Sequence, residues 1–427
     1  NGEGSRAFVR VFHEEARAEA NASDRLRAAG IVRSPIDGIP VSVKDLCDVA
    51  GHTTRAGSVV LNDAPPAIRD ATALARLRAG GAVIVGTTNM VEFAYGGAEH
   101  NDAYGPPKNP WGLSHLTGGS SSGSGAAVAA GSVPIALGSD TAGSVRAPAS
   151  LNGLTGHKPT YGLVSRFGVT PLSWSMDNVG PLARTAEDVA ISMNVLAGHD
   201  PRDGASARHA KEDYVAALRD DLAGVRIGVL QDDYIWDVVV PEVKTAFDQA
   251  VSRLTSIGAT TEALSMGDLE QLTAAQFTLT TGEANAYHQQ MIRESPELYH
   301  PVVRRRIEAG FFLPAAAYVQ AQRVRNMFAD RFARLFETFD LLIAPTTPMP
   351  APEFDAVAFR LPNGEMPSRE LVRITRIFNP NGLPAISVPC GFTPAGMPIG
   401  MQMAGKPFAD GLVIGAAHAY QQATDWH

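Results

Sequence analysis

Cysteine is scarce in this sequence. Cys47 and Cys390 are the only two cysteines in 427 residues, and they lie far apart along the chain. Such a pair provides neither a disulfide framework nor the ligand spacing of a zinc site. We therefore expect a protein of the reducing cytoplasm.

Long hydrophobic runs are also lacking. The longest apolar stretch, residues 126–138, is too short and too rich in small side chains to span a bilayer. No secretory signal peptide is visible near the N-terminus. The sequence therefore predicts a protein that does not contact membranes.

Positive charge is not in excess. Lysine and arginine together number 36, against 44 aspartate and glutamate residues, which gives a formal net charge of −8. This balance disfavours non-specific binding to nucleic acids and to anionic membranes. We therefore expect a small-molecule substrate and no nucleic-acid partner; a homodimer is an open alternative to a monomer.

The residues that are present are those of a globular protein with a large core. Hydrophobic residues make up 45% of the chain and charged residues 19%. Amphipathic segments alternate with short apolar runs that end in glycine or proline, a pattern typical of α/β proteins. The pattern predicts helices over residues 14–29, 70–79, 240–257 and 316–339, and strands over 40–44, 82–85, 132–137, 226–231, 341–344, 386–389 and 399–403.

Residues 118–159 are poor in charge and dense in glycine, serine and alanine. Such composition usually indicates a flexible linker. Here the stretch runs directly into AAVAAGSVPIAL, residues 126–137, which favours a buried helical turn followed by a buried strand. Glycines beside core elements mark close backbone approach or positive φ angles. We therefore interpret this stretch as part of the core.

Four segments together resemble the amidase signature family of serine hydrolases. They are residues 38–45 (GIPVSVKD), 118–159, 176–184 (MDNVGPLAR) and 382–389 (GLPAISVP). Several motifs in the right order are far more specific than one short pattern. The resemblance implies one compact α/β domain over residues 1–427, with a mixed central β-sheet covered by helices on both faces. Its helical lead-in would occupy roughly residues 1–34 and its signature core roughly 36–190.

Amide hydrolysis needs a nucleophile, a base and donors for the oxyanion. Ser144 is the candidate nucleophile, because it follows a predicted strand and comes directly after Thr141, Ala142 and Gly143. The backbone N–H groups of this loop can converge on one point and stabilise the oxyanion. No metal and no organic cofactor is needed for this chemistry.

Lys44 is the candidate base, since no histidine lies in a motif that specifies one; His100, His115 and His157 are interpreted as packing or hydrogen-bonding residues. Lys44 ends the predicted strand 40–44, and burial of an ammonium lowers its pKa. Taken alone, an ion pair with Asp45 or Asp48 would be the simpler interpretation of this lysine.

The resemblance also implies a role for Ser120, which lies 24 residues before Ser144. The family residue at this position has a cis peptide bond and relays a proton between the lysine and the nucleophile. The implied triad is therefore Ser144, Ser120 and Lys44, with an acyl-enzyme on Ser144. Substrates of the family include amides, esters, ureas and carbamates.

Other residues near the motifs have supporting or alternative roles. Asp140 and Arg146 are expected to brace the loop, and Ser121 to hydrogen-bond within the network. Two interpretations stay open for the remaining candidates: they line the substrate pocket, or they pack in the hydrophobic core. These candidates are Tyr95, Trp174 and Met176.

Two positions depart from the family pattern. Ala142 replaces the first of two usual glycines before the nucleophile, so either its φ is negative or the oxyanion loop is altered. Ser122 replaces a common glycine and adds a hydroxyl near Ser120. Neither change removes a catalytic atom.

The free-standing amidase is the main interpretation, and two alternatives stay open. One is the amidase-like subunit of a tRNA-dependent amidotransferase, which needs protein partners. The other is a binding protein on the same fold that has lost catalysis, although the presence of Lys44, Ser120 and Ser144 together speaks against it. Substrate specificity is expected to depend on loops around residues 280–312 and 354–376.

Overall fold

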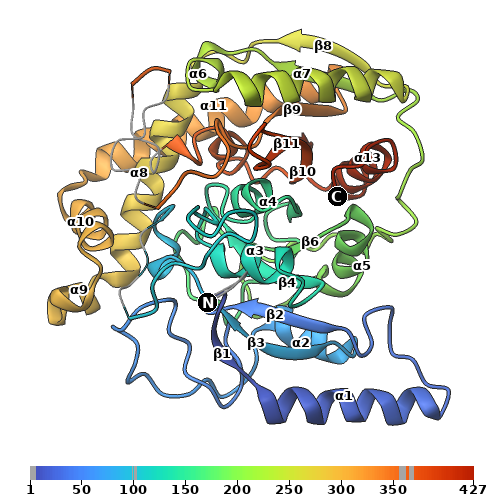
Figure 1. The fold of residues 1–427 in the computed structure, drawn as a ribbon. Helices are drawn as coiled ribbons and strands as arrows, with labels where there is room; N and C mark the ends of the chain where they lie inside the picture. Colours follow the sequence, from blue (N-terminus) through green and yellow to red (C-terminus); the bar gives the residue numbers. More distant parts are fainter. Residues whose placement is uncertain (1–5, 99, 101–102, 355–361, 365–369) are drawn as a thin grey trace.

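The structure is a computed structural model that describes residues 6–98, 100, 103–354, 362–364 and 370–427. Its described strands form one mixed sheet of eleven, in the order β1-β3-β2-β4-β6-β5-β10-β11-β9-β7-β8. Figure 1 shows helices packed around this sheet. The predicted α/β class and mixed central sheet are confirmed. The strands are β1 Phe8–Val11, β2 Pro40–Lys44, β3 Val83–Thr88, β4 Ile135–Asp140, β5 Thr155–Lys158, β6 Asn178–Ala183, β7 Arg226–Leu230, β8 Thr260–Leu264, β9 Leu341–Pro345, β10 Ala385–Phe392 and β11 Pro398–Gly405.

Helices cover both faces of the sheet. Helices α2, α5 and α13 pack against one another on one side of the central strands, while α3 and α4 pack against the other. Helix α8 packs against both α10 and α11, and all three helices contribute side chains to the main core (Figure 1). The helices are α1 His13–Ala28, α2 Thr72–Ala79, η1 Glu92–Ala94, α3 Ser122–Ala129, α4 Arg146–Leu151, α5 Ala186–Leu196, α6 Asp233–Trp236, α7 Pro241–Ser256, α8 Leu269–His288, α9 Met291–Glu294, η2 Pro296–Leu298, α10 Pro301–Ala309, η3 Gly310–Phe312, α11 Ala315–Thr338, η4 Thr375–Phe378 and α13 Asp410–Gln422.

Strand β4 shows why the sheet needs cover on two sides. Its side chains alternate, so that Ile135 and Leu137 join the main core with Val189 of α5. Ala136, between them, joins a smaller cluster with Val128 of α3. A strand that is apolar on both faces must be covered on both faces. The Gly- and Ser-rich stretch is therefore core, as predicted, rather than linker.

Most predicted elements lie close to their expected residues, but β4 begins and ends three residues later than predicted. Pro134 precedes its first residue, and a proline has no N–H for the sheet ladder. The polar residues Ser139 and Asp140 extend the strand because they pair antiparallel with β6. The hairpin of β10 and β11 is confirmed as an antiparallel pair.

Strands β2 and β4 are neighbours and run parallel, with Val43 opposite Leu137. Their carboxyl ends therefore meet at the same edge of the sheet, where active sites of open α/β sheets gather. Lys44 ends β2 and Asp140 ends β4. No helix among the described residues is both long and apolar enough to cross a membrane.

Candidate active site

Lys44 is fully buried and its amine is surrounded by three serine hydroxyls. Its Nζ lies 2.6 Å from Ser120 Oγ, 3.0 Å from Ser121 Oγ and 2.9 Å from Ser139 Oγ. It forms no ion pair with Asp45, whose carboxylate instead accepts from the Gly57 N–H. The structure therefore does not support the simpler interpretation, in which Lys44 forms an ion pair with Asp45.

Burial lowers the pKa of Lys44 to about 7, although the charges of Cys47, Asp140 and Asp177 partly oppose the shift. A neutral amine has two N–H donors and one lone pair, so one neighbouring hydroxyl has to donate to it. The hydroxyl of Ser121 already donates to the Ser139 carbonyl, at 3.2 Å. The lone pair therefore faces Ser120 or Ser139.

Ser144 lies in the loop between β4 and α4 and is buried, with 7% of its surface exposed. Its Oγ accepts from the backbone N–H of Ser120 at 3.1 Å. The structure thus brings Lys44, Ser120 and Ser144 together, with the two serines joined through this backbone contact. The cis peptide bond implied for Ser120 is not present, since no peptide bond between described residues is cis.

Gly118 and Gly119 explain how the chain reaches this geometry with trans bonds. Both have positive φ angles, 70° and 60°, which side chains with a Cβ rarely adopt. A Cβ on Gly119 would lie 2.6 Å from Pro148 Cδ of α4. Two consecutive left-handed glycines therefore turn the chain where it lies against α4, directly before Ser120.

The oxyanion loop differs in one donor from the prediction. The N–H of Gly143 donates to Asp140 Oδ1 at 2.7 Å, so it braces the loop rather than facing the cavity. The candidate oxyanion donors that remain are the N–H groups of Thr141, Ala142 and Ser144. Gly143 has φ 126°, whereas Ala142 is not among the residues of positive φ. We predicted that Ala142 either has a negative φ or alters the oxyanion loop, and the structure shows that its φ is not positive.

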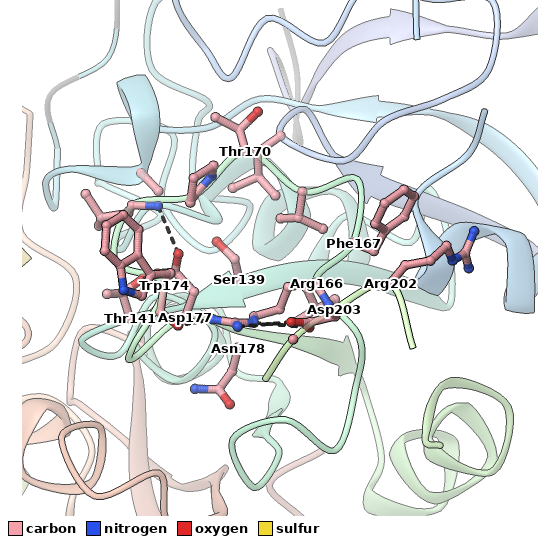
Figure 2. Close-up of a pocket in the computed structure, with 17 residues that line it drawn as sticks. Ser139, Thr141, Arg166, Phe167, Thr170, Trp174, Asp177, Asn178, Arg202 and Asp203 are labelled. Atoms are coloured by element: carbon pink, nitrogen blue, oxygen red, sulfur yellow. Dashed lines mark hydrogen bonds and ion pairs between the residues drawn. The ribbon is translucent and has the colours of Figure 1, made fainter. Parts of the chain in front are cut away.

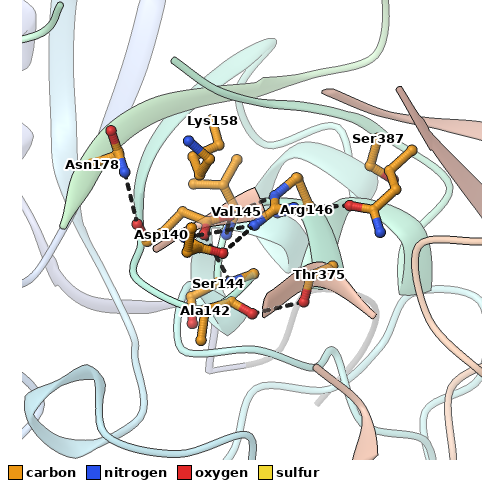
Figure 3. Close-up of polar contacts among 12 residues, drawn as sticks. Asp140, Ala142, Ser144, Val145, Arg146, Lys158, Asn178, Thr375 and Ser387 are labelled. Atoms are coloured by element: carbon orange, nitrogen blue, oxygen red, sulfur yellow. Dashed lines mark hydrogen bonds and ion pairs between the residues drawn. The ribbon is translucent and has the colours of Figure 1, made fainter. Parts of the chain in front are cut away.

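Asp140 and Arg146 form a fully buried ion pair that braces the same loop (Figure 3). Arg146 Nε lies 3.0 Å from Asp140 Oδ2, and its other nitrogens donate to Asn379 and Gln402. Burial opposes ionisation of Asp140, but the Arg146 guanidinium outweighs burial and lowers the pKa of the carboxyl to about 2. Neither side chain lines the cavity beside Ser144.

A cavity of about 380 Å³ opens beside Ser144. Tyr95 lines it, and the Tyr95 hydroxyl lies 3.0 Å from Thr281 Oγ1. Met176 does not line it, because it is fully buried in an apolar cluster with Leu279 of α8. Of the two interpretations of Met176, pocket wall and core residue, the structure supports the core residue.

A second cavity, of about 200 Å³, adjoins the first, and both are lined by Ala94, Thr141 and Leu172. Figure 2 shows this second cavity, with Trp174 and Ser139 on its walls. Trp174 is half exposed there and does not line the cavity that holds Ser144. Thr141 of the oxyanion loop therefore borders both cavities, whereas Ser144 lines only the first.

The serines and histidines near the motifs have identifiable contacts. Ser121 Oγ accepts from Lys44 and from the Ser139 N–H, so it belongs to the lysine network as expected. Ser122 Oγ, which replaces a usual glycine, lies 2.8 Å from Nε2 of His100. His157 pairs with Asp410 at 3.1 Å. Neither histidine is hydrogen-bonded to Ser144, in keeping with their predicted packing roles.

Sequence reasoning misses Ser139 and Thr375. The predicted strand ends at residue 137 and leaves Ser139 in a loop, yet Ser139 is the third hydroxyl on Lys44. Thr375 Oγ1 donates to the Ala142 carbonyl at 2.7 Å, over more than 200 residues of sequence. No local pattern could connect those positions.

The loops expected to set specificity contribute in part. Thr280 and Arg306, within residues 280–312, line the cavity beside Ser144. Val372 and Arg376 do the same from residues 354–376, of which 355–361 and 365–369 lie outside the described residues. No group of three or more metal-binding side chains occurs in the part of the chain that is described.

Known proteins similar to this chain agree on one family. The amidase family model matches residues 3–414. The A subunit of the glutamyl-tRNA(Gln) amidotransferase of Roseiflexus sp. (strain RS-1) is 40% identical over 99% of this chain and 90% of its own length.

Two solved structures are also similar. One is from a vestigial protein complex that reveals the evolutionary origins of an s-triazine catabolic enzyme, with TM-score 0.92 and 40% identity over 97% of this chain and 90% of its own. The other is a bacterial aryl acylamidase of the amidase signature family, with TM-score 0.90 and 30% identity over 99% of this chain and 89% of its own.

These relatives overturn the expected partners. The net charge of −8 predicts a small-molecule substrate with no nucleic-acid partner. The amidotransferase relatives are named for a tRNA and as one subunit of an assembly, which contradicts that prediction. Net charge bears on non-specific binding by the chain itself, and it says nothing about what other subunits of an assembly bind.

Proposed function

Because this chain belongs to the amidase family, whose members hydrolyse C–N bonds, we propose that it cleaves an amide through an acyl-enzyme on Ser144. We further propose that it does so as the amide-cleaving subunit of a tRNA-dependent amidotransferase. Two contacts support this chemistry. Lys44 Nζ donates to Ser120 Oγ, and the backbone N–H of Ser120 donates to Ser144 Oγ.

Acylation begins with attack of Ser144 Oγ on the amide carbonyl carbon. The Ser144 proton passes through the Ser120 hydroxyl to neutral Lys44, while the carbonyl oxygen becomes an oxyanion facing the N–H groups of Thr141 and Ala142. Transfer requires the Ser144 hydroxyl to turn from the Ser120 N–H toward Ser120 Oγ. When the C–N bond breaks, the same proton returns from Lys44 through Ser120 to the leaving nitrogen.

Deacylation repeats the sequence with water. Water attacks the ester carbonyl of the acyl-enzyme and gives one proton through Ser120 to Lys44. The bond from the acyl carbon to Ser144 Oγ breaks, and Ser144 regains the proton. The products are a carboxylic acid and an amine or ammonia, and the enzyme is returned unchanged. Ser121 and Ser139 hold Lys44 in place through both halves of the reaction.

The assignment to an amidotransferase is supported by the relatives, which match over about nine-tenths of their own length. In that role the ammonia released at Ser144 is the nitrogen donor for glutamyl-tRNA, whose side-chain carboxylate has to carry a leaving group before ammonia can displace it. Free buried thiols at Cys47 and Cys390 support a cytoplasmic location, where cysteines stay reduced.

A second candidate function is a catabolic amidase that acts on a small amide. The structure from the vestigial complex favours it, because that complex is linked to a catabolic enzyme and matches this chain at the same 40% identity as the amidotransferase relative. The chemistry at Ser144 is the same in both candidates. They differ in the acceptor of the nitrogen.

Ammonia release by the purified full chain from a panel of simple amides separates the candidates. The amidotransferase role predicts slow release by the chain alone and a large increase with the partner subunits of its own genome and glutamyl-tRNA. Full turnover by the chain alone, with no response to those partners, supports the catabolic amidase. Equal ammonia release by wild type and Ser144→Ala would reject the shared mechanism.

A further inference from the structure

The wall of the cavity beside Ser144 contains an enclosed glutamine. Gln276 of α8 lines this cavity, and only 2% of its surface is exposed. Thr280, about one helical turn later, lines the same cavity and is also buried. Phe277 lines the cavity too but is 47% exposed, so the wall that α8 provides runs from a solvent-exposed ring to a buried carboxamide. Because buried polar groups are normally hydrogen-bonded, the partners of this carboxamide are informative.

The contacts of Thr280 determine how the Gln276 carboxamide is oriented. Thr280 Oγ1 donates to the main-chain carbonyl of Gln276 at 2.9 Å. A hydroxyl has one proton, so Thr280 Oγ1 can only accept from the Gln276 side chain. The atom that donates to it, at 3.0 Å, is therefore Nε2, because the carboxamide oxygen has no proton to give. Oε1 is consequently the end of the carboxamide that does not bond Thr280.

Gln276 Oε1 has no hydrogen-bond donor among the residues that the structure describes. It is also not one of the side-chain atoms that are sealed from solvent without a partner, so it retains accessible surface. Because Gln276 is otherwise buried and lines the cavity, that surface belongs to the cavity wall. The wall therefore presents a hydrogen-bond acceptor to a molecule that binds beside Ser144.

Helix α8 holds this acceptor in a defined place. Leu279, on the same helix, packs with Met176 in a buried apolar cluster. Thr281 Oγ1 lies 3.0 Å from the hydroxyl of Tyr95, which lines the cavity from the residue directly after η1. A preorganised acceptor loses little conformational entropy when a ligand binds, so more of its hydrogen bond contributes to affinity.

We propose that Gln276 is a specificity-determining residue, which selects amides whose acyl part carries an N–H or O–H donor. This inference rests on the proposed cleavage at Ser144 and names the substrate class of that site. When the leaving group is ammonia, the part of the substrate that fills the cavity is its acyl part. A donor on that part would bond Oε1, whereas an apolar group would remove Oε1 from water and leave a buried acceptor unpaired, which is costly.

Two pairs of neutral amides test the proposal. Succinamide and levulinamide have the same length and differ only in a terminal NH2 or CH3 group, and so do glutaramide and 5-oxohexanamide. The two chain lengths allow for the separation of Ser144 from Gln276. In at least one pair, kcat/KM should be about tenfold or more higher for the diamide, after correction for its two equivalent amides, because the methyl ketone leaves Oε1 without a donor.

Substitution of Gln276 should remove that preference. Gln276→Met has a side chain of similar length without an oxygen, and it should lower the ratio of kcat/KM for the diamide to that for the methyl ketone to about one. Gln276→Glu keeps acceptor oxygens and should keep the preference for the diamide. Gln271→Met is the matched control, since Gln271 lies on α8 but is exposed and does not line the cavity. It should keep the wild-type ratio, and an unchanged ratio in Gln276→Met overturns the proposal.

A binding experiment separates this proposal from the proposed function. Calorimetry on the full-length Ser144→Ala chain should show tighter binding of one diamide than of its methyl ketone, and Gln276→Met in that background should make the two equal. Equal binding of both members of each pair, or no binding of any of the four amides, overturns the proposal. A wild-type chain that shows this binding preference but cleaves no amide, even with the other subunits of an amidotransferase from its own genome, would instead reject the function at Ser144.

Discussion

The proposed chemistry depends on Lys44, a lysine that the fold excludes from solvent. Lys44 is fully buried and has three hydroxyl neighbours instead of a carboxylate. Burial without an anionic partner favours the neutral amine, which lowers the pKa of Lys44 to about 7. A carboxylate in contact would have held the amine charged, and a charged amine cannot accept the Ser144 proton.

The pH dependence of turnover follows from this pKa. In the proposed mechanism the active form of Lys44 is neutral, so kcat/KM should rise as pH increases through about 7 and level off above it. The measurement is kcat/KM between pH 5.5 and 9.5 on a substrate whose charge does not change in that range. Lys44→Met should lose both the activity and this profile. An unchanged midpoint in the residual activity of Lys44→Met would contradict the assignment.

Ser120 should matter more than any other hydroxyl of its segment. Ser120→Ala removes the proposed relay between Lys44 and Ser144, and we expect kcat to fall by about 10² or more. Ser124→Ala is the control, because Ser124 is equally buried but bonds Leu137 O and Thr88 Oγ1 rather than Lys44. Comparable kcat values for the two variants would remove Ser120 from the proton path.

At the scale of secondary-structure elements, the candidate active site is formed at the carboxyl ends of β2 and β4 and is contacted by the short helix η4. The sequence correctly predicts β2 and therefore places Lys44 at a strand end. It ends β4 too early, because glycine, serine and aspartate at residues 138–140 are typical of a loop until β6 supplies their partners. The first residues of η4 fall within the loop 354–376 that was expected to set specificity, but the contacts of Thr375 with Ala142 and of Asn379 with Asp140 were not predictable, since they span more than 200 residues.

The packing of η4 on the oxyanion loop depends on Gly143. Its φ of 126° is strained for other residues, and a Cβ there would overlap Thr375 Oγ1. Gly143→Ala should therefore displace the loop and lower kcat by about 10²–10³, the effect of losing an oxyanion donor. Gly131→Ala is the control for backbone strain alone, since its φ is also positive but its nearest neighbour would be 3.6 Å away.

The outcome is read from kcat and the melting temperature together. Both variants should lower the melting temperature, because both introduce a Cβ at a left-handed position. Only Gly143→Ala should lose kcat on all substrates. A normal kcat for folded Gly143→Ala would show that Thr375 and the loop do not need this close contact.

At the scale of the whole molecule, a buried polar network joins distant parts of the chain. Arg146 of α4 contacts Asp140 of β4 (Figure 3). It also donates to Asn379, after η4, and to Gln402 of β11. The residues of this network come from both halves of the sequence. Sequence motifs suggest a brace between Asp140 and Arg146, but only the fold reveals that the brace also includes Asn379 and Gln402.

Removal of Arg146 should destabilise the protein as a whole. Arg146→Met would leave Asp140 buried without its cation, at a cost of about 3–5 kcal/mol in the free energy of unfolding. Urea unfolding followed by circular dichroism measures it. Arg226→Met is the control, because its ion pair with Asp340 lies at the surface and should contribute little. Equal stability of both variants would refute a structural role for the buried pair.

Covalent labelling tests the central claim most directly. A fluorophosphonate probe should attach to one serine of the native chain, and mass spectrometry should place it on the peptide that contains Ser144. Labelling should be slowed in Ser120→Ala and Lys44→Met and absent in Ser144→Ala. A label on any other serine, or full amide hydrolysis by folded Ser144→Ala, would contradict the account.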